Sequence, residues 1–118
     1  MIAKQLTQPL KEAIFASPDY IAKHGQPASL NELAEHKLIQ YRFIASNQLA
    51  PFKLNYNNQV LTVDTEHSII VNDTDLVVES AKKQFGLGRM VENVVRNELS
   101  SGELVPVLQD YWFTYPGL

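Results

Sequence analysis

The feature that most constrains the fold is a short apolar run that stops abruptly at two polar residues. Ser68–Val71 is this run, and Asn72 and Asp73 follow it directly. A continuous apolar run of this length predicts a central β-strand that is covered on both faces. Apolar residues then recur every four positions from 77 to 85, which predicts an amphipathic helix. The chain is therefore expected to contain a strand-to-helix junction of the α/β type.

The same kind of pattern continues along the rest of the chain. Strands are predicted at 11–16, 38–41, 52–56, 60–63, 68–71, 87–90 and 104–107, and helices at 18–24, 29–36, 74–85 and 92–101. Asn57 and Asn58 form a two-residue hairpin turn in this scheme, and Pro106 marks the last strand as an edge strand. Because helices alternate with apolar strands, we expect a single α/β domain with a mostly parallel sheet and helices on both faces.

Two of the predicted helix starts carry strong capping signals. Ser17 can accept hydrogen bonds from the free amides of the first helix, and Pro18 suits its first position. Asn72 and Asp73 stand in the equivalent place before a later helix, at the end of a strand where open α/β sheets bind ligands. One of these two residues is expected to cap the helix, and both are candidates for ligand contact. In a parallel sheet the two junctions would open on the same side.

The composition excludes several classes of function. The 118 residues are 45% hydrophobic and carry a formal net charge of −3, which is typical of a globular domain and unlike a basic nucleic-acid-binding surface. The absence of cysteine excludes disulfides and thiolate metal sites. No apolar run approaches the roughly 20 residues of a membrane span, and residues 1–6 lack a signal-peptide stretch. We therefore expect a soluble, cytoplasmic protein without a membrane partner.

The sequence offers little support for catalysis or for a metal site. His24 and His36 fall near the ends of predicted helices, where histidine suits the helix dipole, and no zinc-type histidine spacing occurs. Residues 86–88, Gly-Leu-Gly, follow a helix instead of opening one, so they do not form a dinucleotide loop. We expect a binding domain without catalytic residues, metal or cofactor. A small enzyme that uses Asp73 with His24 or His36 is the alternative from another class.

Four aromatic residues lie within five positions near the C-terminus, at 111–115. Such a cluster is rarely left in water and usually packs on something. We expect it to contact another lobe or a second copy of the chain, or to pack back onto this domain.

Several segments of the chain resemble the effector domain of LysR-type transcriptional regulators. Residues 16–27 are similar to the family segment A-S-P-x-Y-L-x-x-H-G-x-P, and residues 29–36 resemble the x-x-x-D-L-x-x-H that follows it. Residues 71–73, 86–88 and 99–108 match the remaining landmarks of the family in order and spacing. The resemblance covers residues 3 to 112, which is nearly the whole chain.

The resemblance implies that residues 1–118 form the second lobe of a two-lobed effector domain with a periplasmic-binding-protein-like (type 2) fold. It implies that DNA is contacted only through a missing N-terminal helix-turn-helix domain. A small-molecule effector, commonly an organic anion, would bind between this lobe and a first lobe and alter a homo-oligomer. The resemblance assigns seven residues to the cleft: Ser17, Pro18, Asn72, Asp73, Thr74, Gly86 and Leu87.

Two departures from the family pattern leave the identity of the effector open. Arg89 stands where the family usually has small apolar residues, and it could reach the cleft as a cation or lie on the surface. Asp73 makes a purely anionic effector less favourable at this place. Half of a periplasmic-type solute-binding receptor is the alternative function, which the lack of a signal sequence disfavours.

Overall fold

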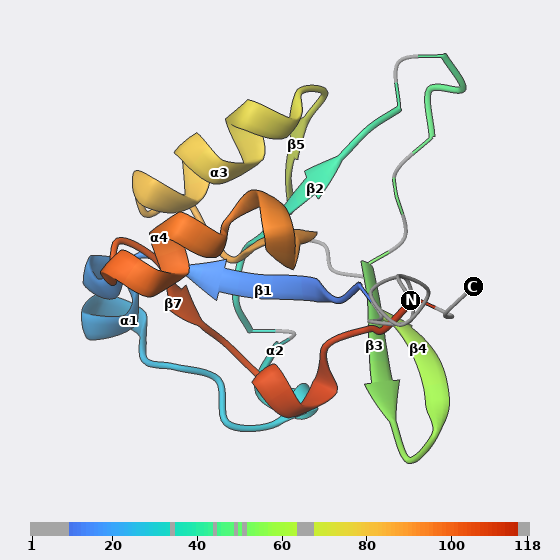
Figure 1. The fold of residues 1–118 in the computed structure, drawn as a ribbon, viewed down its shortest axis with the longest axis horizontal. Helices are drawn as coiled ribbons and strands as arrows, with labels where there is room; N and C mark the ends of the chain where they lie inside the picture. Colours follow the sequence, from blue (N-terminus) through green and yellow to red (C-terminus); the bar gives the residue numbers. More distant parts are fainter. Residues whose placement is uncertain are drawn as a thin grey trace, which may run out of the picture.

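The computed structural model describes residues 10–33, 35–43, 45–48, 50, 52–63 and 68–115 (Figure 1). The elements in chain order are β1 (Glu12–Ala16), α1 (Pro18–His24), α2 (Leu30–Leu33), β2 (Leu38–Tyr41), β3 (Phe52–Tyr56), β4 (Gln59–Val63), β5 (Ser68–Val71), α3 (Thr74–Lys82), β6 (Gly88–Val91), η2 (Glu92–Val94), α4 (Arg96–Ser101), β7 (Val105–Pro106) and η3 (Gln109–Tyr111). Each predicted strand has a counterpart. The helix predicted at 92–101 is divided at Val95 into η2 and α4. Residues 1–6, which were searched for a signal peptide, lie outside the described residues.

The strand β1 is the centre of the main sheet. It pairs antiparallel with β6 on one side and with β7 on the other, and all five of its residues are buried. β2 and β5 form a parallel pair, which meets the main sheet through a parallel bridge between Leu38 and Leu87. In Figure 1, β1 crosses the middle of the domain, and α3 lies beside β2 and β5.

The expectation of a mostly parallel sheet is not confirmed, although the α/β class is correct. Among the described strands, three of the four pairings are antiparallel: β1 with β6, β1 with β7, and β3 with β4. The physical reason lies in the connection from β1 through α1 and α2. This connection leads to β2, which does not lie next to β1, because the beginning of β6 lies between them. No helical crossover joins β1 to a neighbouring strand, so nothing forces β1 to run parallel.

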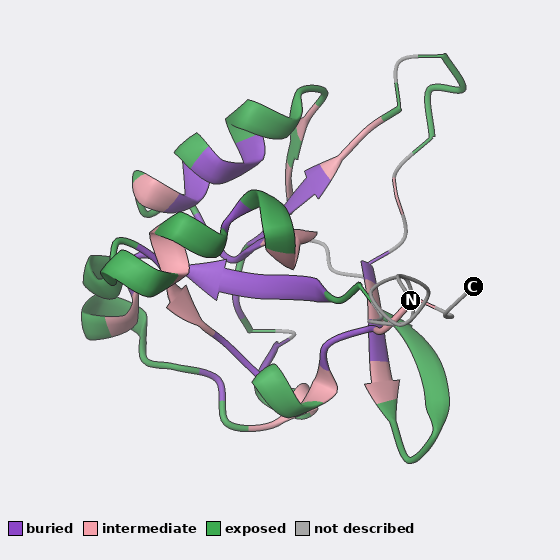
Figure 2. Ribbon diagram, viewed as in Figure 1, coloured by how far each residue is buried: buried purple, intermediate pink, exposed green. Residues whose placement is uncertain are grey.

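The prediction that β5 is a central strand covered on both faces is wrong. In the described part of the chain β5 pairs only with β2, and Ile70 is 46% exposed. Figure 2 shows instead that β1 is buried along its length, while β4 is exposed. Apolar content alone does not distinguish an edge strand with an apolar outer face from a buried central strand.

The structure confirms the predicted hairpin turn and one of the alternatives for the aromatic cluster. Asn57 and Asn58 have φ values of 51° and 63°, as a two-residue turn between β3 and β4 requires. Trp112 and Phe113 are only 4% and 8% exposed. The Trp112 indole donates a hydrogen bond of 2.9 Å to the carbonyl of Val107. The aromatic segment therefore packs back onto the domain.

Leu87 provides a direct test of the junction between the two parts of the sheet. Its side chain is completely buried, and its amide donates to the carbonyl of Lys37 at 2.8 Å. We predict that Leu87→Ala lowers the free energy of unfolding by about 2–5 kcal/mol, the usual range for a leucine truncated in a core. Leu76→Ala is the matched control, because Leu76 is 46% exposed and should change stability by less than about 0.5 kcal/mol. Urea denaturation measures both values, and equal losses would contradict the assignment of Leu87 to the core.

Candidate functional site

The residues assigned to the cleft by sequence fall into two groups at opposite edges of the sheet. Leu38, at the start of β2, faces Leu87 just before β6, and Phe15, near the end of β1, faces the first residue of β6. Ser17 therefore lies at the edge where β2 and β6 begin. Asn72 follows β5, which runs parallel to β2, so it lies at the edge where these strands end. The expectation that both junctions open on the same side is wrong, because β1 runs antiparallel to β6.

We call these two places the Asn72 edge and the Ser17 edge. Asp73 caps α3 at the Asn72 edge: its backbone is extended, and its Oδ1 accepts a hydrogen bond of 2.8 Å from the amide of Asp75. Asn72, Asp73 and Thr74 are all exposed. The prediction that one of the two polar residues caps the helix is confirmed for Asp73. This edge thus presents polar side chains next to the N-terminus of α3, where the helix dipole favours anionic groups.

A buried charged cluster connects β1, β6 and the C-terminal segment. The Arg89 guanidinium forms an ion pair with Oε1 of Glu12, and the Tyr115 hydroxyl donates to Oε2 of the same carboxylate. The side chains of Arg89 and Glu12 are only 9% and 11% exposed, and Arg89 also lies 5.0 Å from the centre of the Phe52 ring. The Arg89 side chain is therefore buried, and the alternative that it lies on the surface is wrong.

The cluster borders a cavity of about 120 Å³. The cavity is lined by Glu12, Phe43, Ala50, Lys53, Arg89 and Tyr115. Burial and the bond to the Glu12 carboxylate raise the pKa of Tyr115 to about 12, so its hydroxyl remains a donor at neutral pH. The Glu12 carboxylate therefore accepts hydrogen bonds from both Arg89 and Tyr115. Lys53 is a further charged residue in the lining of this cavity, and it does not belong to the cluster.

We predict that Arg89→Met strongly destabilises the domain because it leaves the Glu12 carboxylate buried without its cation. The expected loss in the free energy of unfolding is about 3–5 kcal/mol. Glu12→Gln combined with Arg89→Met should lose clearly less than the sum of the two single variants, because no charge is then buried. A double-mutant cycle by denaturation measures this coupling, and strict additivity would contradict a direct pairing.

The Ser17 edge holds the other four residues that the sequence assigned to the cleft. The Ser17 hydroxyl accepts a hydrogen bond of 3.0 Å from the amide of Tyr20, which confirms its capping role, and Pro18 is exposed. Gly86 and Leu87 are buried. A Cβ atom on Gly86 would lie 2.5 Å from the carbonyl oxygen of Lys37, so this glycine is explained by a close backbone approach.

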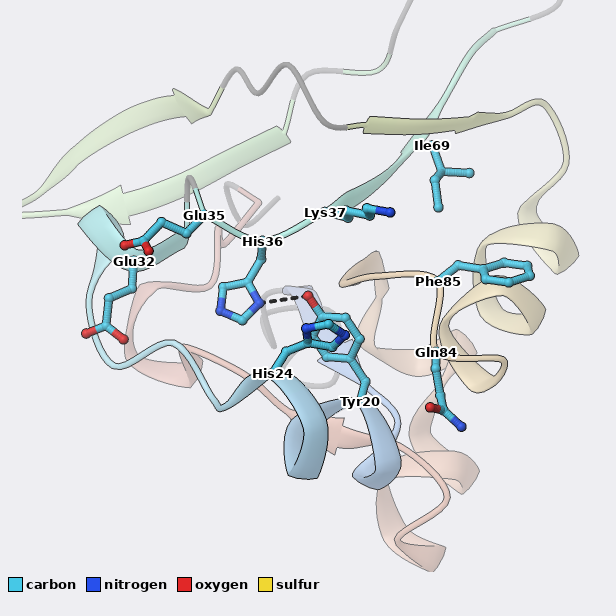
Figure 3. A pocket seen from close by; sticks show the side chains of 9 residues that line it. All are labelled: Tyr20, His24, Glu32, Glu35, His36, Lys37, Ile69, Gln84 and Phe85. Atoms are coloured by element: carbon cyan, nitrogen blue, oxygen red, sulfur yellow. Dashed lines mark hydrogen bonds between the residues drawn. The ribbon is translucent and has the colours of Figure 1, made fainter.

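A larger cavity of about 450 Å³ opens beside these residues (Figure 3). It is lined by Tyr20, His24, Glu32, Glu35, His36, Lys37, Ile69, Gln84 and Phe85. The Tyr20 hydroxyl bonds to Nδ1 of His36 at 2.7 Å, and the rings of Tyr20 and His24 lie 4.6 Å apart. From the sequence both histidines are expected at helix ends, and nothing in that expectation brings them together with Tyr20. The spacing of Tyr20 and His24, one helical turn apart, was the available signal.

Burial is the main cause of the pKa shifts of both His36 and Tyr20. It lowers the pKa of His36 from 6.5, and neighbouring His24 lowers it further, while Glu35 and Glu32 act in the opposite direction. It also raises the pKa of Tyr20 above 10.0. A neutral tyrosine thus faces a neutral histidine at pH 7. Asp73 lies at the opposite edge, so the alternative of an enzyme that uses Asp73 with His24 or His36 is not supported.

The lowered pKa of His36 predicts how stability depends on pH. Its contribution is fully present above pH 6.5 and is lost as the pH falls through the folded pKa, because the unfolded chain then binds more protons. We expect His36→Asn to lose less stability than the wild type between pH 7 and pH 5, since asparagine does not titrate. Thermal unfolding at several pH values measures this difference. Parallel pH profiles for the two proteins would contradict a buried, neutral His36.

The described residues include neither a helix that could span a membrane nor a cluster that could hold a metal ion. No helix in the described part is long and apolar enough to cross a membrane. No group of three or more histidine, aspartate or glutamate residues within the same part is placed to hold a metal ion.

Comparisons with known proteins define the class of this domain. Its fold matches the regulatory domain of AphB in Vibrio vulnificus, with a TM-score of 0.73 and 20% identity over 89% of this chain and 51% of that chain. It also matches the regulatory domain of CrgA, a LysR-type transcriptional regulator from Neisseria meningitidis, with a TM-score of 0.72 and 22% identity over 93% of this chain and 54% of that chain. The fold is therefore that of regulatory domains of LysR-type regulators.

The sequence comparisons extend this from the fold to the family. The family model for the LysR substrate binding domain matches residues 11–116, and this chain belongs to that family. The chain is 26% identical over 117 residues to the uncharacterized HTH-type transcriptional regulator YcaN of Escherichia coli, which covers 99% of this chain and 37% of that protein. The HTH-type regulator PgrR of the same organism is also 26% identical, over 99% of this chain and 39% of that protein. The chain thus spans under two fifths of these relatives, which are named as transcriptional regulators and not as enzymes.

Proposed function

We propose that this chain is the effector-sensing second lobe of a LysR-type transcriptional regulator, and that the effector meets it at the Asn72 edge. The main observation is that exposed Asn72, Asp73 and Thr74 lie at the same edge as the buried Glu12–Arg89–Tyr115 cluster. The amide of Tyr115 donates to the carbonyl of Leu10 at 2.8 Å, so the described chain also enters and leaves at this edge. A first lobe joined through these two segments would face it across a cleft.

The chemistry of the Asn72 edge suits a small polar effector with an anionic group. The amide end of α3 and the side chains of Asn72 and Thr74 supply donors, and Lys53 supplies a cation in the lining of the small cavity. Asp73 is committed to capping through one of its oxygens, which reduces its conflict with an anion. The proposal gives Ser17, Pro18, Gly86 and Leu87 structural roles, because they lie at the other edge.

The proposal assigns the remaining activities to parts of the regulator outside these residues. The net charge of −3 is unlike that of a nucleic-acid-binding domain, so DNA would be contacted through an N-terminal domain in a homo-oligomer. A cytoplasmic location and the absence of a membrane partner follow from that role. The relatives named as transcriptional regulators favour this function over half of a solute-binding receptor.

The test titrates the full-length regulator with a panel of small organic acids and follows thermal stability and reporter output. The acid with the largest effect should bind Asn72→Ala at least about fivefold more weakly, the size expected for one lost hydrogen bond to a charged group. Operator binding without the acid should be unchanged. Asn97→Ala is the matched control, because Asn97 is an exposed residue of α4.

Two results would argue against the proposal. Unaltered acid binding in both Asn72→Ala and Thr74→Ala would remove the effector from this edge. A specific operator shift by the 118-residue chain alone would show that this lobe contacts DNA itself.

A further inference from the structure

The small cavity at the Asn72 edge is lined by a buried cation whose hydrogen-bond donors are largely unused. Among the described residues, Arg89 donates a hydrogen bond to Glu12 through Nη1, while its Nε is buried without an acceptor. A guanidinium carries five N–H donors in a planar fork. Because a buried donor without an acceptor is unfavourable, an acceptor group that enters this cavity would be stabilised by Arg89.

Lys53 adds a second positive charge to the lining of this cavity. Its ammonium lies 5.1 Å from the centre of the Phe113 ring and forms no ion pair with a described residue. Arg89 and Lys53 outnumber the carboxylate of Glu12, which is the acidic group of the described lining. The cavity therefore has a net positive charge and favours an anionic group.

The size and the walls of the cavity limit what it can hold. Its volume of about 120 Å³ is below the roughly 300–1,000 Å³ of small-molecule pockets, so it suits one charged group of a ligand and not a whole ligand. A planar carboxylate matches the fork of a guanidinium. Phe43 and Ala50 form the apolar part of the wall, which suits a carboxylate that is joined to a hydrocarbon.

The cavity lies close to the place where the effector is proposed to bind. The amide of Arg42 donates to the carbonyl of Val71 at 2.8 Å. Phe43 follows Arg42 in the chain, and Asn72 follows Val71. A ligand whose carboxylate lies in the cavity could therefore extend past Phe43 toward Asn72.

We propose, on the basis of the function proposed above, that this cavity holds a carboxylate group of the effector. The carboxylate accepts hydrogen bonds from Lys53 and from the donors of Arg89 that Glu12 leaves unused. The remainder of the effector lies over Asn72 and Thr74, toward the first lobe. We call the cavity with its two cations the carboxylate site.

The position of Arg89 also connects the carboxylate site to the segments that lead to the first lobe. The amide of Glu12 donates to the carbonyl of Phe113 at 2.8 Å. The amide of Tyr115 donates to the carbonyl of Leu10 at the same distance. Arg89 and Tyr115 both bond the Glu12 carboxylate at this pairing. An effector carboxylate on Arg89 therefore binds next to the two paired segments.

The first experiment titrates the 118-residue chain with acetate and with acetamide, which has nearly the same shape but no charge, at constant ionic strength. The side-chain Nε–Hε signal of Arg89 and the backbone amide signals of residues 12, 53 and 89 are followed by NMR. Acetate should shift the Arg89 Nε–Hε signal and should bind at least about tenfold more tightly than acetamide. An unshifted Arg89 signal, or equal binding of the two compounds, would overturn the proposal.

Two lysine variants that remove the same charge then locate the site. Lys53→Gln should weaken acetate binding at least about fivefold, because it removes one of the two cations. Lys11→Gln is the matched control, because Lys11 is exposed at the same edge but does not line the cavity. Neither lysine is buried, so both variants should fold. Equal losses of acetate binding in the two variants would indicate a general effect of charge and contradict the carboxylate site.

Measurements on the full-length regulator separate the carboxylate site from the proposed function. The most effective organic acid is compared with its amide, and Lys53→Gln should reduce the preference for the acid at least about fivefold, while Lys11→Gln should not. If Asn72→Ala weakens the acid but Lys53→Gln keeps the full preference, the effector binds at this edge outside the cavity, and the carboxylate site alone is contradicted. If Asn72→Ala, Thr74→Ala and Lys53→Gln all leave binding of the acid unaltered, the proposed function fails together with the carboxylate site.

Discussion

The pairing of β1 along both of its sides is the constraint on which the rest of the domain depends. β6 binds one side, while β7 and then the segment around Phe113 bind the other, where Phe113 accepts a hydrogen bond of 2.8 Å from the amide of Glu12. β1 is consequently buried throughout, including a charged residue at its start. A carboxylate in that position is tolerated only because Arg89 and Tyr115 bind it. The charged cluster and the antiparallel direction of β1 therefore belong to one arrangement.

That direction also determines how the polar junctions are distributed. Because β1 runs against β6, the residues after β1 and the residues after β5 lie at opposite edges of the sheet. Asn72 and Asp73 share their edge with the charged cluster, whereas Ser17 shares its edge with the tyrosine–histidine pair of the larger cavity. The two edges have different chemistry: one offers donors and a buried arginine, and the other offers aromatic rings and carboxylates.

Local patterns in the sequence predicted local structure well. The cap at Ser17, the Asn57–Asn58 turn and the strand boundaries around residues 38–41 follow from side chains close in the chain, and all are confirmed. The direction of β1 depends on which strand becomes its neighbour, and contacts between residues 12–15 and 88–91 leave no local signal. The prediction that Ser17 and Asn72 lie together failed for this reason. The burial of Arg89 was also beyond local reasoning, because its partner Glu12 is 77 residues away.

Hydrogen–deuterium exchange of the intact regulator, with and without its effector, tests the central claim most directly. The account predicts that the effector slows exchange at residues 72–76, and at the neighbouring ends of the sheet near residues 11–12 and 89–91. Residues 17–25 and 84–88, at the other edge, should exchange at unchanged rates. Protection confined to 17–25 and 84–88 would contradict the account, because the effector would then occupy the edge that the antiparallel β1 separates from Asn72.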